Sequence, residues 1–339
     1  MYFVFSLVAL LCWSGSDFFS KHGTKENDKN SHWKVVFAVG LVMGIHFLIT
    51  LIGGAVIDDP ESVPKFVASL FYTDFKLMDF VRYLPVSALY ILAMVLGYVG
   101  LRYIELSISS PICNSSGALA FLLCLIFGLT SADEVSLMAV IGIILITVGV
   151  VGLGFVESFE DDGARLARQE KANRKYAKSF LALLLPIAYL IIDALGTFGD
   201  ELIFSIEDEA GNGIITDYAA NSAFELTFFL LAIFAFIYLK CVKKDTAFKG
   251  NRSFMLGGIC ETIGQIFYMA VMFSDFTAGM VIISAYCALS LVWSRIFLKE
   301  TLSWKHYLAI GIAFVGIMVL GVAEELWCVD CGGFNCVCE

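Results

Sequence analysis

Charged residues are scarce in this chain of 339 residues. Asp, Glu, Lys and Arg make up 16% of the sequence, whereas soluble domains carry about a quarter. Hydrophobic residues reach 59%, and the mean hydropathy is +0.83. The net charge of −10 argues against nucleic-acid binding, which needs a basic surface. The composition is therefore that of an integral membrane protein.

Patterns for catalysis and nucleotide binding are also missing. The sequence has no Gly-rich phosphate loop, no ATPase domain and no HExxH motif, and its four histidines are scattered. The first apolar run lacks the basic start and small-residue cleavage site of a secretory signal, so we expect it to remain as a span. These absences argue against an enzyme or a primary pump, and no cofactor is expected.

What is present is a series of ten apolar runs, each long enough to cross a bilayer. Backbone polar groups in lipid must be bonded within their own segment, so all ten runs are expected to be helices. The runs are Tyr2–Ser20, Trp33–Ile57, Arg82–Leu101, Ile108–Leu129, Val135–Val156, Phe180–Ser205, Asp217–Lys240, Ser253–Ser274, Ala278–Leu298 and Trp304–Ala323. The predicted fold class is all-α integral membrane, with ten transmembrane helices.

The two halves of the chain end alike. Ala120–Gly154 aligns with Cys287–Gly321 without gaps, at an offset of 167 positions. The aligned pairs include Asp133 with Glu300, Ser136 with Ser303, Gly149 with Gly316, and Gly154 with Gly321. Each half has five spans, an odd number, so the second copy would enter the membrane inverted. Inverted repeats are typical of secondary transporters, whose site lies between the halves near the midplane.

The predicted organisation follows from this repeat. Residues 1–156 form the first five-helix repeat and residues 180–323 the second, with a charged linker over 157–179 and a Cys-rich tail over 324–339. The linker is either solvated or a short helix on the membrane surface. Within the loop 58–80, residues 64–80 are partly amphipathic and are a candidate for the interface.

The basic residues are distributed unequally between the loops. Of the 22 Lys and Arg, 19 follow odd-numbered runs, and the other three are Lys65, Lys76 and Arg82. The positive-inside rule then places the odd loops in the cytoplasm and both termini outside.

Short motifs resemble a known family. Trp13, Gly15 and Lys21 resemble the first-helix pattern of the drug/metabolite transporter superfamily, EamA type, and Glu300-Thr-Leu-Ser303 resembles its recurring repeat-end signature. Asp133 takes the acidic place in the first repeat. The resemblance implies a basket of ten helices around a cavity that opens alternately to each side, and a small transported solute. It also implies cytoplasmic termini, contrary to the charge distribution.

Acids inside the runs are the candidate site residues, because a charge at the centre of a membrane helix is costly unless it faces water or a partner. Shifting the first run onto the sixth by 176 positions places Trp13 on Tyr189 and Asp17 on Asp193. Two acids at matching places in inverted halves would flank a cavity. The alternative for Asp17 is an interfacial acid near a helix end.

Two further acids lie about eight residues into their runs. Glu225 shares a helix face with Asn221, and Glu261 shares one with Gln265, each at a spacing of four. Such carboxylates can carry protons or hold a cationic substrate, and the alternative is a structural hydrogen bond between helices. His46, on an apolar helix, is interpreted as a hydrogen-bonded packing residue.

The tail contains four cysteines within eleven residues, namely Cys328, Cys331, Cys336 and Cys338. This set is a candidate metal site, with disulfides or no role as alternatives. We therefore expect a secondary transporter in the cell membrane, a monomer or homodimer, with a small polar metabolite, lipid and protons as partners. The alternative is a membrane receptor or metal sensor that uses the tail.

Overall fold

The computed structural model is all-helical over the part of the chain that it describes, which is residues 2–25, 28–129, 136–171, 180–207, 211, 213–245, 252–272 and 282–330. Its helices are α1 (Tyr2–Gly23), α2 (Ser31–Gly54), η1 (Pro60–Ser62), α3 (Lys65–Phe71), α4 (Leu77–Gly100), α5 (Leu106–Cys113), α6 (Ser116–Ile126), α7 (Leu137–Phe159), α8 (Asp162–Lys171), α9 (Phe180–Phe204), α10 (Asp217–Ile237), the π-helical turn η3 (Tyr238–Val242), α11 (Arg252–Met272), α13 (Tyr286–Phe297) and α14 (Trp304–Asp330). The all-α prediction is confirmed.

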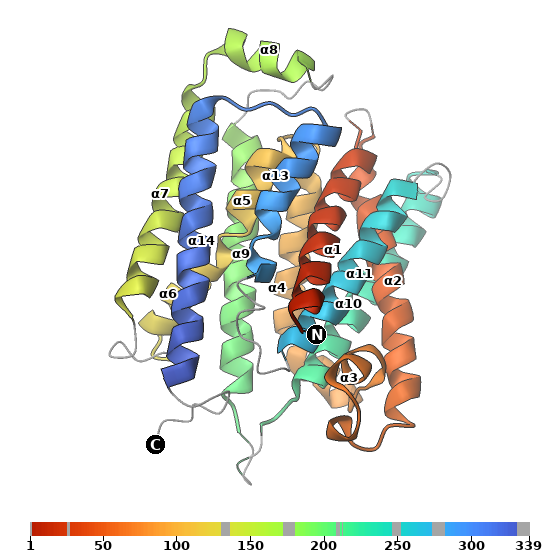
Figure 1. Cartoon of the computed structure of the whole chain (residues 1–339). Helices are drawn as coiled ribbons and strands as arrows, with labels where there is room; N and C mark the ends of the chain where they lie inside the picture. The colour runs from red at the N-terminus through yellow and green to blue at the C-terminus, as the bar shows by residue number, and fades with distance from the viewer. Residues whose placement is uncertain are drawn as a thin grey trace.

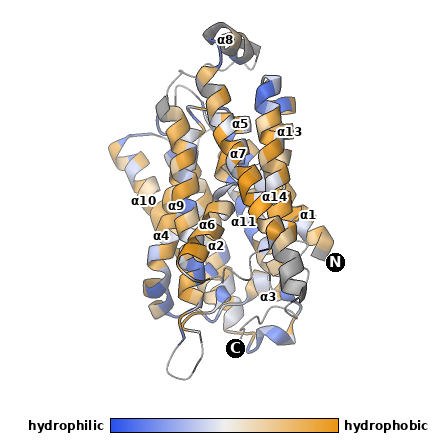
Figure 2. Ribbon diagram, turned by 90° about the vertical axis from the view of Figure 1, so that its left-hand side faces the viewer, coloured by the Kyte–Doolittle hydropathy of each residue, from blue (hydrophilic) through white to orange (hydrophobic). Residues whose placement is uncertain are grey.

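Within these described ranges, nine helices are long and apolar enough to cross a membrane. A shorter apolar helix spans Ile282–Phe297. These lengths and compositions indicate a multi-pass membrane protein, as the sequence predicts. Hydrophobic residues follow the helices along their length, and hydrophilic residues gather toward the ends of the bundle (Figure 2).

The outer faces of the helices are apolar. On α7 the side chains of Ile141, Ile144, Val148, Val151 and Phe155 are all exposed, and their spacing places them on one face. A contiguous apolar surface of this kind is rare on a soluble monomer. It suits contact with lipid, which leaves the opposite face of α7 for packing.

The helices pack in four main pairs, which are α7 with α14, α1 with α11, α2 with α10, and α4 with α9. Further contacts join α2 to α11, α10 to α4, α1 to α13, and α6 to α9. Figure 1 shows the bundle with α8 at one end, while α1 begins and α14 ends at the other. These pairs bring the two halves of the chain together along their whole length.

Glycine allows close approaches within these pairs, among them the contact between α7 and α14. A Cβ added to Gly149 would lie 2.4 Å from the backbone nitrogen of Ala313, and one added to Gly316 would lie 2.6 Å from that of Ile146. Real Cβ atoms essentially never come closer than 3.0 Å to another heavy atom. The two backbones therefore touch at positions where any larger residue would separate them.

The linker and the segment before α4 both contain short helices. Within the linker, residues 162–171 form the helix α8. The segment before α4 contains η1 and α3, and α3 packs against α2 and α11. Gly53 and Gly54 allow this contact, because a Cβ on them would lie 1.9 Å from the Phe71 carbonyl and 2.1 Å from that of Thr73.

Candidate functional site

Two broken helices meet in the bundle. The run predicted over Ile108–Leu129 is interrupted at Asn114 and Ser115, between α5 and α6, and the other break falls at Ala285, just before α13. Nδ2 of Asn114 donates a hydrogen bond to the carbonyl oxygen of Ser284 at 2.7 Å. The breaks are therefore adjacent, and each frees backbone groups that a continuous helix would use internally.

Two of the predicted acids lie beside these breaks. Oδ2 of Asp17 accepts hydrogen bonds from the hydroxyls of Ser110 at 2.7 Å and Ser290 at 2.9 Å, which come from α5 and α13. Oδ2 of Asp193 accepts one from the hydroxyl of Ser116, at the start of α6, at 2.6 Å. Because α1 continues to Gly23, Asp17 lies within the helix, six residues before its end.

A third predicted acid joins the same group. Glu261 of α11 accepts a hydrogen bond from Ser16 and lies within electrostatic range of Asp17. Tyr286 lies within range of both Asp17 and Asp193. We call Asp17, Asp193 and Glu261 the central carboxylates.

No ion pair neutralises the central carboxylates among the residues that the structure describes. The nearest base along the chain is Lys21, one helical turn after Asp17. Its Nζ donates instead to the carbonyl oxygens of Leu101 and Ile104, each at 2.5 Å, beyond the end of α4. Within the described residues, the central carboxylates therefore have serine hydroxyls as hydrogen-bond donors and no basic side chain as an ion-pair partner.

Aromatic residues lie in the same region as the central carboxylates. The ring of Trp13 packs against those of Tyr268 and Tyr286, with centroids 5.1 and 5.8 Å apart. Tyr189 lies within electrostatic range of Asp193 and Glu261, and Tyr98 within range of Glu261 and Asp17. The structure therefore brings Trp13 and Tyr189, the predicted aromatic pair, to the same region as the acids.

Two polar atoms in this region have no hydrogen-bond partner among the described residues. They are the hydroxyl of Tyr98, a residue that is only 9% exposed, and Nε1 of Trp13. Asp17, Asp193 and Glu261 are themselves partly exposed, although they lie among the packed helices. Unused donors beside partly exposed acids are the features of a site that receives a ligand.

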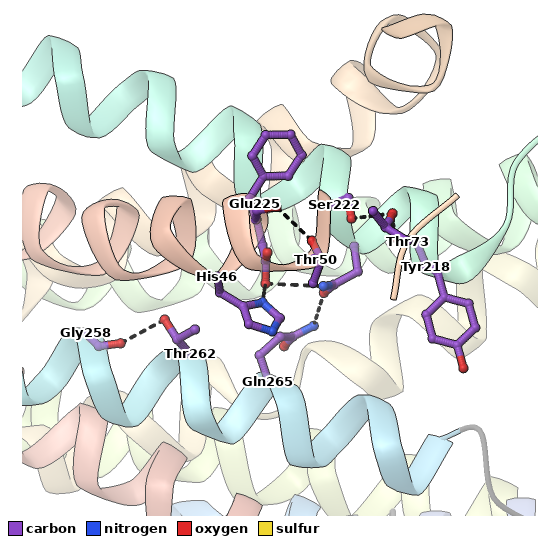
Figure 3. A network of polar contacts seen from close by, with 11 residues as sticks. His46, Thr50, Thr73, Tyr218, Ser222, Glu225, Gly258, Thr262 and Gln265 are labelled. Carbon is purple, nitrogen blue, oxygen red and sulfur yellow. Dashed lines mark hydrogen bonds and ion pairs between the residues drawn. The ribbon is translucent and has the colours of Figure 1, made fainter. Parts of the chain in front are cut away.

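A second polar group lies between α2, α10 and α11 (Figure 3). Nδ1 of His46 lies 2.7 Å from Oε1 of Glu225, which has no exposed surface. Nδ2 of Asn221 donates to the same oxygen at 3.3 Å, and Nε2 of Gln265 donates to Oδ1 of Asn221 at 3.1 Å. The predicted residues Glu225, Asn221 and Gln265 thus form one network, while Glu261 belongs to the other group.

Sequence reasoning missed two partners. His46 is predicted to be a hydrogen-bonded packing residue, and it does form a hydrogen bond in the structure. Its partner, which the sequence did not indicate, is the candidate site residue Glu225. Asp200 is not among the predicted residues, yet it accepts hydrogen bonds from the hydroxyls of Tyr83 and Tyr90, the latter at 2.5 Å. The available signal was its spacing, because Asp200 lies seven residues after Asp193 and so on the same face of α9.

The cysteine prediction falls mostly outside the described residues. Cys331, Cys336 and Cys338 lie beyond them, and for Cys328 only the backbone of α14 is described. Within the described residues, no group of three or more His, Cys, Asp or Glu side chains could hold a metal ion. The acidic place at Asp133 also falls outside the described ranges.

Comparison with protein-family models and with curated proteins finds no match to this chain.

Proposed function

We propose that the chain is a secondary transporter of a small polar metabolite, built like the EamA-type drug/metabolite transporters that its motifs resemble. Substrate would bind at the central carboxylates, in a cavity reached alternately from each side of the membrane. The carboxylates could also carry protons, which would couple the solute to a gradient. The packing of the two halves is the observation that carries this proposal.

The number of crossings fits the proposal. To the nine long helices we add Ile282–Phe297, whose 16 residues are helical apart from the break at Ala285, as the tenth span. The beginning of α1 and the end of α14 lie toward the same end of the bundle (Figure 1), as an even number of crossings would place them. Nine crossings would leave them at opposite ends.

Helix contacts are those expected of two inverted copies. Exchanging the halves replaces α1 by α9, α2 by α10, α4 by α11, and α7 by α14. The contact of α1 with α11 then becomes that of α9 with α4, and the contact of α2 with α11 becomes that of α10 with α4. The pairs α2 with α10 and α7 with α14 map onto themselves. Such pairing favours a pseudo-two-fold relation between the halves, and five spans in each half would place its axis in the membrane plane.

Residue contacts repeat in the same way. At the offset of 167 positions, Gly149 corresponds to Gly316 and Ile146 to Ala313, so the close approach of Gly149 to Ala313 has its counterpart in that of Gly316 to Ile146. These are the two closest glycine contacts between α7 and α14. A chance resemblance of two helices would not be expected to match contacts as well as residues.

The aromatic pair repeats as well. A Cβ on Gly264 would lie 2.5 Å from Cδ1 of Trp13, and one on Gly97 would lie 2.9 Å from Cδ2 of Tyr189. Gly97 and Gly264 are also 167 positions apart. The offset found at the repeat ends therefore extends to α4 and α11, next to the central carboxylates.

The charge distribution supports a cell-membrane orientation in which the α8 end faces the cytoplasm. A receptor or metal sensor that uses the tail gains no support from the described residues, because the tail cysteines lie beyond them or have undescribed side chains. The oligomeric state proposed is a monomer or homodimer.

Transport can be tested with purified protein in liposomes, under an imposed proton gradient, against amino acids, nucleosides, sugars and organic amines. We expect saturable flux for at least one class, abolished in the double variant Asp17→Asn, Asp193→Asn and retained in Glu61→Gln, whose side chain is exposed outside the bundle. Removal of Glu325 onward should leave flux unchanged. Absence of saturable flux for every class, from folded and inserted protein, would refute the proposal.

A further inference from the structure

We infer that the solute bound at the central carboxylates is a small organic cation, an amine whose largely apolar body carries a polar group. This inference rests on the proposed function, since it names the substrate class of the same site. Three properties of the site support the inference of a cationic solute. They are its uncompensated negative charge, its aromatic lining and its hydrogen-bonding groups without a partner among the described residues.

Charge is the first property. Asp17, Asp193 and Glu261 are held by serine hydroxyls and by no Lys or Arg in an ion pair within the described residues. Carboxylates in a low-dielectric interior are normally paired with a cation or neutralised by a proton. A cationic solute supplies the missing charge, whereas an anionic solute would add to the repulsion.

Aromatic rings are the second property. Tyr286 lies one helical turn before Ser290, which donates to Asp17, and Tyr189 lies one turn before Asp193 on the same face of α9. Trp13 packs against Tyr286 with ring centroids 5.8 Å apart. Ring faces attract organic cations, and desolvated sites gain about 2 kcal/mol or more from such a contact. The aromatic rings therefore strengthen the preference for a cationic solute that the carboxylates already create.

Unused polar groups are the third property. The hydroxyl of Tyr98, within range of Glu261 and Asp17, has no partner among the described residues, and neither has Nε1 of Trp13. A buried polar atom without a partner is costly, so such atoms are commonly completed by water or by a ligand. Polar substituents on the body of the amine would satisfy them.

The test uses three probes of the same size that differ in charge, namely tyramine, tyrosol and 4-hydroxyphenylacetate, together with tetraethylammonium. Binding to the purified full-length protein is measured by calorimetry in detergent. We expect tyramine to bind at least about tenfold more tightly than tyrosol, a difference of about 1.4 kcal/mol, and no binding of the acid. Affinity for tyramine should fall as the pH is lowered, because protons and amine compete for the same carboxylates.

Variants separate the site from the rest of the protein. Glu261→Gln and Tyr98→Phe both keep the size of the side chain. Glu261→Gln should weaken tyramine binding about tenfold or more, and Tyr98→Phe should weaken it by a smaller factor. The control Glu61→Gln should bind tyramine like the wild type. The elution profile on gel filtration controls for folding. If neither cation binds more tightly than tyrosol, the inference is overturned.

The two proposals can fail separately. Cation binding without flux in liposomes would refute the transporter and retain the cation site. Saturable flux of neutral or anionic solutes, without cation binding, would retain the transporter and refute the cation site.

Discussion

The contact between α7 and α14 predicts the effect of a single methyl group. A Cβ at Gly149 would lie 2.4 Å from the nitrogen of Ala313, and ordinary van der Waals contact begins at 3.4 Å, so Gly149→Ala requires the helices to separate by roughly 1 Å. Both atoms that collide are close to the backbone, so no side-chain rotation can relieve the clash. Gly316→Ala meets the nitrogen of Ile146 at 2.6 Å and requires a similar movement.

Matched controls exist on the same two helices. A Cβ on Gly152 would meet only Cβ of Ala309 at 3.7 Å, and one on Gly311 would meet nothing within 4 Å. All four substitutions gain the same helix propensity, about 1 kcal/mol from Gly to Ala. The comparison therefore isolates overpacking, which costs about 1–3 kcal/mol.

We expect Gly149→Ala to be less stable than Gly152→Ala by about 1–3 kcal/mol, and Gly316→Ala to differ from Gly311→Ala by the same amount. Thermal unfolding in detergent, followed with a thiol-reactive dye, suits the measurement because Cys124 and Cys287 are buried. Equal melting temperatures for the close-contact variants and their controls would refute the packing. Combining the two close-contact substitutions should cost less than their sum, since one separation relieves both.

Two further predictions concern buried polar contacts. His46→Gln and Glu225→Gln should each lower the melting temperature. The double variant should lose less unfolding free energy than the two single variants together, with a coupling of about 0.5–3 kcal/mol. Strictly additive losses would mean that the 2.7 Å contact between His46 and Glu225 does not stabilise the protein. Glu300→Ala should cost about 1.5–3 kcal/mol, because the carboxylate accepts from the backbone nitrogen of Ser107 at 3.1 Å and its hydroxyl at 2.9 Å. Lys305→Ala, at an exposed position, should not alter stability, and equal melting temperatures for these two variants would contradict the role given to Glu300.

Much of the fold was predictable because membrane helices leave a direct mark in the sequence. Apolar runs gave the helix positions, and α9, predicted over Phe180–Ser205, ends at Phe204. The break between α5 and α6 was not predictable from hydropathy, since the run continues across it. Pro111 lies within α5, and the chain leaves the helix three residues later, at Asn114, whose side-chain amide donates a hydrogen bond to the other broken helix.

The sequence predicted which residues belong to the site, but it did not predict which residues they contact. Depth in the membrane selected Asp17, Asp193 and Glu261, because a buried charge must be explained. Helix-face spacing paired Gln265 with Glu261, but the structure bonds Gln265 to Asn221 on another helix. Spacing along one helix says which residues share a face, while the neighbour across the interface depends on how the helices are placed.

The carboxylate of Glu300 ties together elements from opposite halves of the sequence. It follows α13, and it holds Leu106 and Ser107 at the start of α5 through three hydrogen bonds. In a transporter of the kind proposed, opening the substrate site toward the α8 side would require the Glu300 carboxylate to lose its hydrogen bonds from Leu106 and Ser107 and to be hydrated instead. In such a transporter these three bonds would favour the form closed on that side, and a neutral residue at position 300 would make the outward-open and inward-open populations more nearly equal.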